Sequence, residues 1–288
     1  MYSAEFDYYR AGSVAEASDL LKKHPGAKLL AGGHSLIPLL KLRLASPTAL
    51  IDIGRIAELK GITVSDGTIR IGPLTTHAEL AASPVLREHC PALADAAARV
   101  GDPAVRNRGT IGGNVAHADP ASDLPTVLAA LGARITTAGP GGRRTVDARD
   151  FCTGMMTTTL GDQDVLTGID VPARKKSQGQ AYAKFEHPAS RYAVIGVAAV
   201  MTVSGGKCTG ADIAVGGCVP RPVRATAVEK ALTGQVLSPE AIAQASRQVA
   251  QDLGDDILGD LYASADYRKN VASVWVKRAI TAAVERTK

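Results

Sequence analysis

The stretch AGGHSLIPLLKLRL, residues 31–44, places two glycines, a histidine and a serine between a short apolar run and a predicted helix. Adjacent glycines such as Gly32 and Gly33 are typical of a tight turn or of a backbone that approaches another group closely. Their N–H groups, followed by a helix start, also suit an anion, because both favour negative charge. On its own, the pair is compatible with a turn or with a ligand site.

A second stretch of the same character, RNRGTIGGNVAHADPASDLP, spans residues 106–125. Here Gly112 and Gly113 are flanked by Thr110 and Asn114, whose side chains carry hydrogen-bond donors. Two such stretches favour a clamp that holds a diphosphate from both sides. The chain has neither GxGxxG nor GxxxxGK[ST], so the scaffold differs from the common nucleotide-binding loops.

Composition bounds the class of protein. With 288 residues, 45% hydrophobic and 21% charged, the chain has the make-up of a globular protein of about two domains. Aromatic residues make up only 4%, and no run of like charges accompanies the net charge of +5, so no nucleic-acid partner is expected. The four cysteines form no CxxC pair and the six histidines no close pair, so no metal site is expected. The absence of a long apolar segment predicts no transmembrane span.

Periodicity and turn signals predict a mixed helix and strand fold. Helices are expected at residues 13–23, 36–44, 76–82, 84–89, 91–100, 124–131, 224–232, 239–253 and 267–286. Strands are expected at residues 27–30, 50–53, 62–64, 68–71, 134–137, 144–146, 164–171, 181–186, 193–203 and 208–215. Three strands followed by helices at the end of the chain indicate an α+β class, and the polar segment 172–180 indicates a domain boundary.

The two glycine stretches, in the contexts LAGGHSLIPLLKLRLASPTALIDI (30–53) and RGTIGGNVAHADPASDLP (108–125), resemble the FAD-binding medium subunit of the molybdenum hydroxylase (xanthine dehydrogenase) family. The likeness is greatest to the carbon monoxide dehydrogenase medium subunits. It extends to FDYYRAGSVAEA (6–17), VLTGIDVP (165–172) and YRKNVASVWVKRA (267–279), and so covers nearly the whole chain.

This resemblance implies a particular α+β architecture. Residues 1–175 would form an FAD-binding domain of the PCMH or vanillyl-alcohol-oxidase-like type, with subdomains at about 1–55 and 56–175. Residues 180–288 would form a smaller α+β domain like the C-terminal domain of the carbon monoxide dehydrogenase flavoprotein, with a three-stranded antiparallel sheet and helices.

The resemblance also implies where a non-covalently bound FAD lies. The first loop would wrap the diphosphate with Ala31, Gly32, Gly33, His34 and Ser35, and the second with Thr110, Ile111, Gly112, Gly113 and Asn114. Asp123 would hydrogen-bond the sugar or ribityl hydroxyls, although the sequence also allows it to be the N-cap of helix 124–131. Leu166 would contact the cofactor through its backbone. Lys184 and Tyr192 would lie near the isoalloxazine ring, where a cation tunes the potential and a phenol ring stacks.

Two alternatives stay open for His34 and for the chain as a whole. In another branch of the broader flavin-oxidase fold, a histidine in a GGH loop is bonded covalently to the flavin; the family resemblance favours non-covalent binding here. A stand-alone flavin-dependent oxidase and a flavin-free scaffold subunit are the other functions considered.

The family implies a division of labour between subunits. This chain would accept electrons from an iron–sulfur small subunit carrying [2Fe-2S] clusters and pass them to a quinone, NAD or oxygen. A molybdenum-binding large subunit would carry the molybdenum cofactor, and the assembly would be a dimer of heterotrimers. No catalytic residue is expected on this chain, and its location would be the cytoplasm, with the inner face of the membrane as an alternative.

Overall fold

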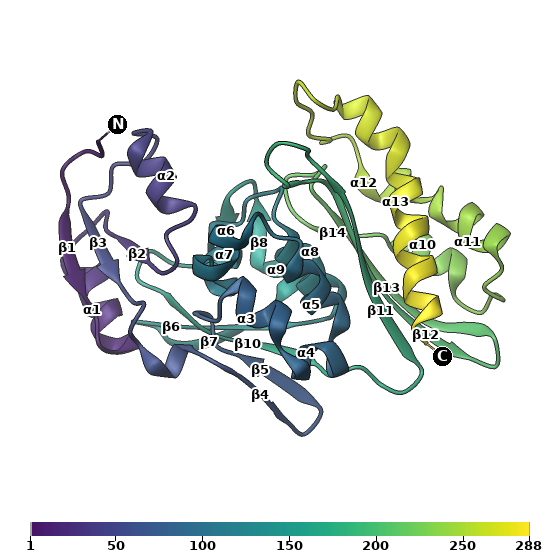
Figure 1. The fold of residues 1–288 in the computed structure, drawn as a ribbon, viewed down its shortest axis with the longest axis horizontal. Coiled ribbons are helices and arrows are strands. Elements are labelled where there is room, and N and C mark those ends of the chain that lie inside the picture. Colours follow the sequence, from purple (N-terminus) through teal and green to yellow (C-terminus); the bar gives the residue numbers. More distant parts are fainter. Residues whose placement is uncertain (1, 288) are drawn as a thin grey trace.

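A computed structural model describes residues 2–287. Its three main sheets follow one another along the long axis of the molecule, from the N-terminal sheet to the C-terminal sheet (Figure 1). The expected α+β class is confirmed.

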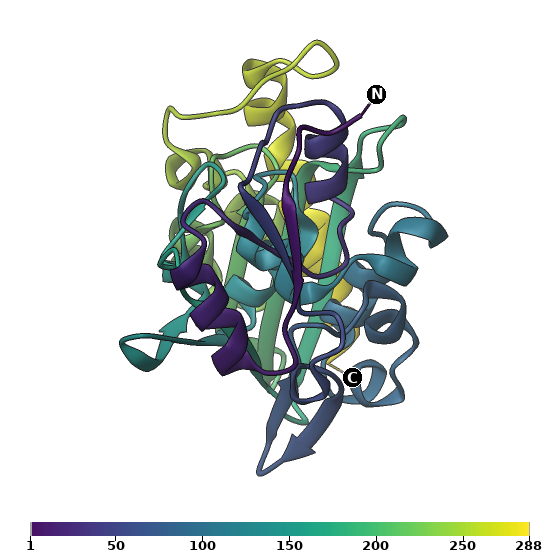
Figure 2. The same ribbon diagram turned by 90° about the vertical axis from the view of Figure 1, so that its left-hand side faces the viewer.

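The N-terminal sheet is parallel, with the order β1-β3-β2. Its strands are β1 (Asp7–Arg10), β2 (Lys28–Leu30) and β3 (Ala49–Asp52). Figure 2 shows this sheet and α1 (Val14–Lys23) facing the viewer. Ser13 caps α1 as predicted, but the Glu16 carboxylate accepts from the Gly12 N–H. The sequence pattern missed β1 because most of its side chains are exposed.

The first glycine stretch lies between β2 and α2 (Leu36–Lys41). The predicted helix 36–44 ends early, since Arg43 adopts a left-handed conformation with φ of 58°. A short 3-10 helix, η1 (Ala57–Leu59), then leads into the middle sheet.

The middle sheet is antiparallel, with the order β4-β5-β10-β6-β7. Its strands are β4 (Ile62–Ser65), β5 (Thr68–Ile71), β6 (Arg134–Gly139), β7 (Gly142–Asp147) and β10 (Val165–Pro172). Both predicted hairpins form. In the first, Asp66 and Gly67 have φ of 51° and 71°, as a two-residue turn between twisted strands requires. A separate two-stranded ribbon joins β8 (Cys152–Gly154) to β9 (Thr157–Thr158).

Seven helices accompany the middle sheet within the described residues. They are α3 (His77–Ala82), α4 (Pro84–His89), α5 (Pro91–Ala98), α6 (Pro103–Arg108), α7 (Ile111–His117), α8 (Asp123–Ala130) and α9 (Ala148–Phe151). The sequence reasoning missed α6, α7 and the four-residue α9. The second glycine stretch is therefore the first turn of α7 rather than a loop, with Thr110 as its N-cap. Two glycines in seven residues hide a helix, because glycine has low helix propensity.

The C-terminal sheet is antiparallel, with the order β11-β12-β13-β14. Its strands are β11 (Gln178–Glu186), β12 (Ala193–Ser204), β13 (Lys207–Gly216) and β14 (Val223–Arg224). The two-residue strand β14 thus extends the three strands that the sequence predicts.

Four helices follow: α10 (Thr226–Leu232), α11 (Pro239–Ser246), α12 (Val249–Leu253) and α13 (Ala265–Glu285). The single helix expected at 239–253 is wrong, because the chain turns between α11 and α12. The Ser246 hydroxyl donates to the Ile242 carbonyl at 2.7 Å, a contact that bends helices.

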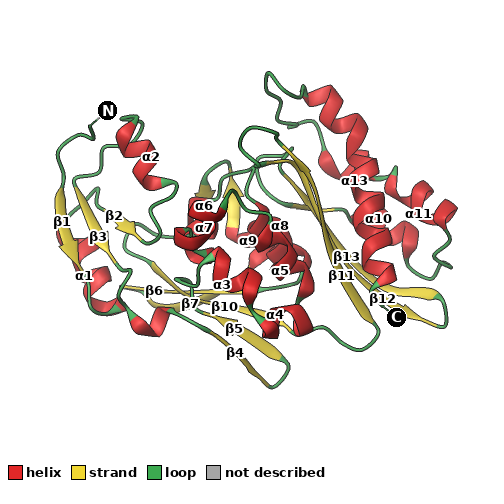
Figure 3. Ribbon diagram, in the orientation of Figure 1, coloured by secondary structure: helices red, strands yellow, loops and turns green. Residues whose placement is uncertain are grey.

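The C-terminal sheet is covered on both faces (Figure 3). Alternate residues such as Tyr182, Ala198 and Ala214 face α5 and α8 and belong to the same apolar core as the middle sheet. Their neighbours, such as Val197 and Ile213, pack on the C-terminal helices, mainly α13. The helix α8 therefore joins the middle of the molecule to the C-terminal sheet.

Candidate functional site

The two glycine stretches meet in space. A Cβ atom built on Gly32 would overlap the carbonyl oxygen of Arg108 and lie 2.9 Å from the Cα atom of Gly109. A Cβ built on Gly113 would lie 4.0 Å from the Cβ of Ala31. The structure thus brings together the residues that the sequence pairs, 31–35 and 110–114, and Gly32 is a glycine because of that close approach.

The first stretch presents a row of backbone donors. Within residues 2–287, the N–H groups of Gly32, Gly33, His34 and Ser35 donate to no protein acceptor. Gly33 has φ of 76°, a left-handed conformation that glycine adopts without strain. Successive N–H groups at a left-handed turn form a concavity that binds anions. The His34 ring stays within the loop, its Nδ1 lying 3.1 Å from the Gly32 carbonyl oxygen.

The second stretch differs, because its first-turn N–H groups are already used. Ile111 donates to the Thr75 carbonyl at 3.0 Å and Gly112 to the Pro73 carbonyl at 2.8 Å. Gly113 donates to the Thr110 hydroxyl at 3.2 Å. A Cβ on Gly112 would overlap Pro73, so this glycine serves helix packing. Gly113 is exposed, and a Cβ there would lie 2.9 Å from the Thr110 hydroxyl and 4.0 Å from the Cβ of Ala31.

Asn114 and Tyr192 are two further polar residues that the sequence assigns to the site. The Asn114 Nδ2 donates to the Ser122 hydroxyl at 3.1 Å, while its buried Oδ1 has no partner within the described chain. The Tyr192 ring is 44% exposed. Burial raises the pKa of Tyr192, and the nearby carboxylates of Asp119 and Asp123 raise it further. Tyr192 therefore lies beside the segment that follows α7.

Asp123 and Lys184 contact one another directly. The Lys184 Nζ lies 2.9 Å from the Asp123 Oδ2, and the Tyr182 hydroxyl donates to the Asp123 Oδ1 at 2.5 Å. The N-cap of α8 is Ser122, so the alternative that Asp123 caps this helix is wrong. Burial raises the pKa of Asp123, while the Lys184 charge and the hydrogen bonds from Tyr182 and Lys184 oppose the shift.

The Lys184 side chain has no exposed surface, and its Nζ also donates to the Arg99 carbonyl at 3.1 Å. Its charge is thus balanced by Asp123 inside the protein. Leu166 is buried on β10 next to a bulge that separates it from Gly168, and α7 packs on the same strand. The contacts of Asp123, Leu166, Lys184 and Tyr192 with a cofactor stay predictions.

His77 is a residue near the site that the sequence reasoning missed. Its ring lies under Gly109, where a Cβ would be 2.8 Å from the ring Cδ2, and its Nδ1 is buried without a partner in the described residues. Burial lowers the pKa of His77 to about 4, with further lowering by His34 and Arg106. The capping box of Thr76 and Glu79, readable in the sequence, fixes His77 as the first residue of α3.

We expect His77 to make the protein less stable in mild acid. Because the pKa of His77 is about 6.5 when unfolded and about 4 when folded, the unfolded chain binds more protons between these values. The free energy of unfolding should therefore fall by about 2 kcal/mol between pH 7.5 and pH 5. Urea titrations at the two pH values measure this, and His77→Gln should remove the loss. His89→Gln, at a more exposed histidine, should retain it; an equal loss in wild type and His77→Gln would contradict the assignment.

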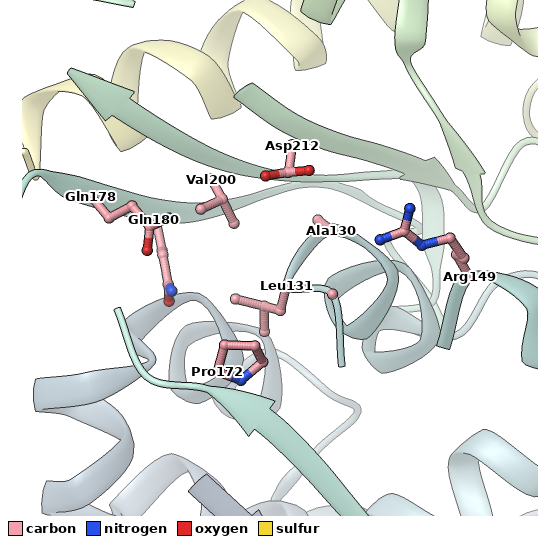
Figure 4. Close-up of a pocket in the computed structure, with 9 residues that line it drawn as sticks. Ala130, Leu131, Arg149, Pro172, Gln178, Gln180, Val200 and Asp212 are labelled. Carbon is pink, nitrogen blue, oxygen red and sulfur yellow. The ribbon is translucent and has the colours of Figure 1, made fainter. Parts of the chain in front are cut away.

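A separate cavity lies at the other end of α8 (Figure 4). Its volume is about 200 Å³, and it is lined by Leu131, Arg149, Gln180 and Asp212 among others. The helix α8 starts at Asp123 and rises about 1.5 Å per residue, so this cavity lies roughly 12 Å from the N-terminal end of α8, which is the end near the glycine stretches. Residues 2–287 contain no cluster of three or more metal-ligating side chains. No helix in the described chain is long and apolar enough to cross a membrane.

Comparison with known proteins decides the family. Residues 4–174 match the family model described as the FAD binding domain in molybdopterin dehydrogenase. The chain belongs to this family. Residues 180–283 match the model of the CO dehydrogenase flavoprotein C-terminal domain.

Relatives match along their whole length. The carbon monoxide dehydrogenase medium chain of Hydrogenophaga pseudoflava is 41% identical, covering 99% of each chain. The nicotine 6-hydroxylase medium subunit of Paenarthrobacter nicotinovorans is 35% identical, covering 97% of this chain and 98% of the relative. A solved structure of carbon monoxide dehydrogenase from H. pseudoflava, lacking the Mo-pyranopterin moiety of its cofactor, has a TM-score of 0.95 at 42% identity and covers 99% of each chain.

The family membership confirms the expected resemblance, the fold class and FAD as the cofactor. The geometry fits that cofactor at its diphosphate, where the four free N–H groups of residues 32–35 follow Ala31, the residue that a Cβ on Gly113 would approach to 4.0 Å. The buried Oδ1 of Asn114 lacks a partner among the described residues, so it can accept a hydrogen bond from a donor of the ligand.

Proposed function

We propose that this chain is the FAD-binding, electron-transfer subunit of a heterotrimeric molybdenum hydroxylase. It accepts electrons from an iron–sulfur subunit and passes them to an external acceptor, a quinone, NAD or oxygen. The observation that carries the proposal is the row of unpaired N–H groups at residues 32–35, which begins next to Ala31, the neighbour of Gly113, in a chain of the FAD-binding family.

Each stretch has a distinct task in this proposal. Residues 31–35 donate N–H groups to the diphosphate oxygens, and Gly113 lets the diphosphate approach α7. Asn114 accepts a hydrogen bond from the cofactor. When bound, FAD supplies the redox chemistry, and the protein supplies orientation and electrostatics. Tyr192 lies along the isoalloxazine ring of FAD, and Leu166 on β10 contacts the cofactor through its backbone.

The attachment of FAD is non-covalent in this proposal. His34 is exposed, and its Nδ1 lies beside the Gly32 carbonyl oxygen of its own loop. No residue of this chain is assigned a catalytic role toward the substrate.

The partners follow from the relatives, several of which are medium chains or subunits of larger enzymes. We propose an iron–sulfur small subunit and a molybdenum-binding large subunit, assembled as a dimer of heterotrimers in the cytoplasm. The molybdenum cofactor and the [2Fe-2S] clusters then belong to those partners. We keep the domain division at 175–180, which agrees with the ends of the two family matches.

Purification through an affinity tag on this chain, from its native host, tests the proposal. We expect two partner proteins to co-purify, with molybdenum, iron and about one FAD per copy of this chain. FAD without partners, together with substrate oxidation by the chain alone, would favour a stand-alone oxidase. Partners without any FAD would favour a scaffold subunit, and either result would contradict the proposal.

A further inference from the structure

We infer that Tyr182 and Lys184 are positioning residues of the flavin site, and that they act through Asp123. Both lie on β11 of the C-terminal sheet, whereas Asp123 starts α8. The inference rests on the proposed function, because its readout is the binding of FAD.

The contact is a buried link between distant parts of the chain. Asp123, Tyr182 and Lys184 are 4%, 7% and 1% exposed. Tyr182 and Lys184 are two residues apart on one strand, so both side chains face α8, and each binds a different oxygen of the Asp123 carboxylate. A carboxylate offers about four acceptor positions, so Asp123 retains capacity for a cofactor hydroxyl.

The sheet is shaped to admit this link. Gly196 pairs with Lys184 on β12, and a Cβ there would overlap the Tyr182 hydroxyl. Gly216 pairs with Gly196 on β13, and a Cβ there would overlap the Thr126 hydroxyl of α8. Two glycines side by side on neighbouring strands therefore let α8 and the Tyr182 ring approach the sheet closely.

Asp123 is the chain neighbour of Ser122, which contacts a residue of the second glycine stretch. Ser122 accepts the hydrogen bond of Asn114, which belongs to the second glycine stretch. The Ala121 carbonyl accepts from the N–H of Ala193, the residue after Tyr192, at 3.1 Å. The segment 119–123 thus places Asn114 and Tyr192 relative to each other, and Tyr182 and Lys184 hold that segment by its last residue.

FAD affinity of the full chain tests the inference. The cofactor is removed and FAD is titrated back, with flavin fluorescence and visible circular dichroism as readouts. Tyr182→Phe keeps the ring and deletes one hydrogen bond to a charged group. We expect its FAD dissociation constant to rise about tenfold, with an altered visible circular dichroism spectrum.

Two controls separate positioning from general stability. Asp95→Asn weakens a contact between α5 and Arg286, the residue that follows α13, whose guanidinium donates to the Asp95 carboxylate at 2.6 Å. This variant should bind FAD within about twofold of wild type. In an Asp123→Ala background, which removes the acceptor of the Tyr182 hydroxyl, Tyr182→Phe should change the dissociation constant by less than about twofold, because its effect passes through that carboxylate.

Three results would overturn the inference. Unchanged FAD affinity in Tyr182→Phe would do so, as would an equal loss in Asp95→Asn or a full effect of Tyr182→Phe without the Asp123 carboxylate. A wild-type chain that binds no FAD would instead contradict the proposed function, and this inference with it.

Discussion

Gly113→Val is expected to lose FAD while remaining folded. Gly113 is exposed in the first turn of α7, and its missing side chain would point toward Ala31, into the space between the two glycine stretches. A valine there occupies the place of the diphosphate. The Gly113 backbone is helical, so valine brings no helix-propensity penalty relative to glycine. Its Cβ would lie 2.9 Å from the Thr110 hydroxyl, so that N-cap side chain must shift slightly. We expect the FAD dissociation constant to rise about 100-fold, equivalent to about 2.7 kcal/mol.

The measurement is the FAD content after desalting, together with the free energy of unfolding of the FAD-free chain. Gly141→Val is the matched control, since a Cβ at this hairpin meets nothing within 4 Å and the backbone is not left-handed. It should retain FAD. Gly33→Val, although in the first stretch, is a less specific test, because φ of 76° strains any branched residue. Full FAD occupancy in Gly113→Val would refute the assignment of the second stretch.

Arg268→Met is expected to cause the largest loss of stability. The Arg268 side chain is buried at the start of α13 and donates to the carbonyls of Val194, Gly217 and Ala263. It also pairs with Asp260. Its removal takes one donor from each of these carbonyls, although that of Ala263 keeps the Asp260 N–H. It also leaves Asp260 without its guanidinium partner, and we expect the free energy of unfolding to fall by about 3 to 5 kcal/mol.

Lys269→Met provides the neighbouring control for that experiment. Lys269 pairs at 3.5 Å with the fully exposed Asp255, so its loss should change the free energy of unfolding by less than about 0.5 kcal/mol. Urea denaturation of both variants gives the comparison. Equal stability of Arg268→Met and Lys269→Met would show that the buried guanidinium does not anchor this part of the chain.

Local signals in the sequence predicted much of the fold correctly. The Asp66-Gly67 hairpin, the Ser13 cap and most strands depend on residues that are neighbours in the chain, so their patterns are readable. The first glycine stretch likewise combines a turn residue and free N–H groups within four positions. The second stretch carries the same Gly-Gly signal, and the likeness of both stretches to a known family indicated FAD as the ligand.

Features that depend on distant residues could not be predicted in this way. Gly112 is required by Pro73, and α7 was hidden because its glycines serve such packing. Asp123 meets Tyr182 and Lys184 about sixty positions further along the chain, because α8 packs on the C-terminal sheet. Nothing in the local sequence of Asp123 distinguishes this buried pairing from a helix cap.

The absorption spectrum of the purified chain, before and after acid precipitation, tests the central claim most directly. We predict a flavin absorption band at about 450 nm and about one FAD per chain. All of the colour should be released into the supernatant. Colour that stays with the precipitate would show covalent attachment, with His34 as the anchor to examine. A colourless chain that takes up no added FAD would contradict the account.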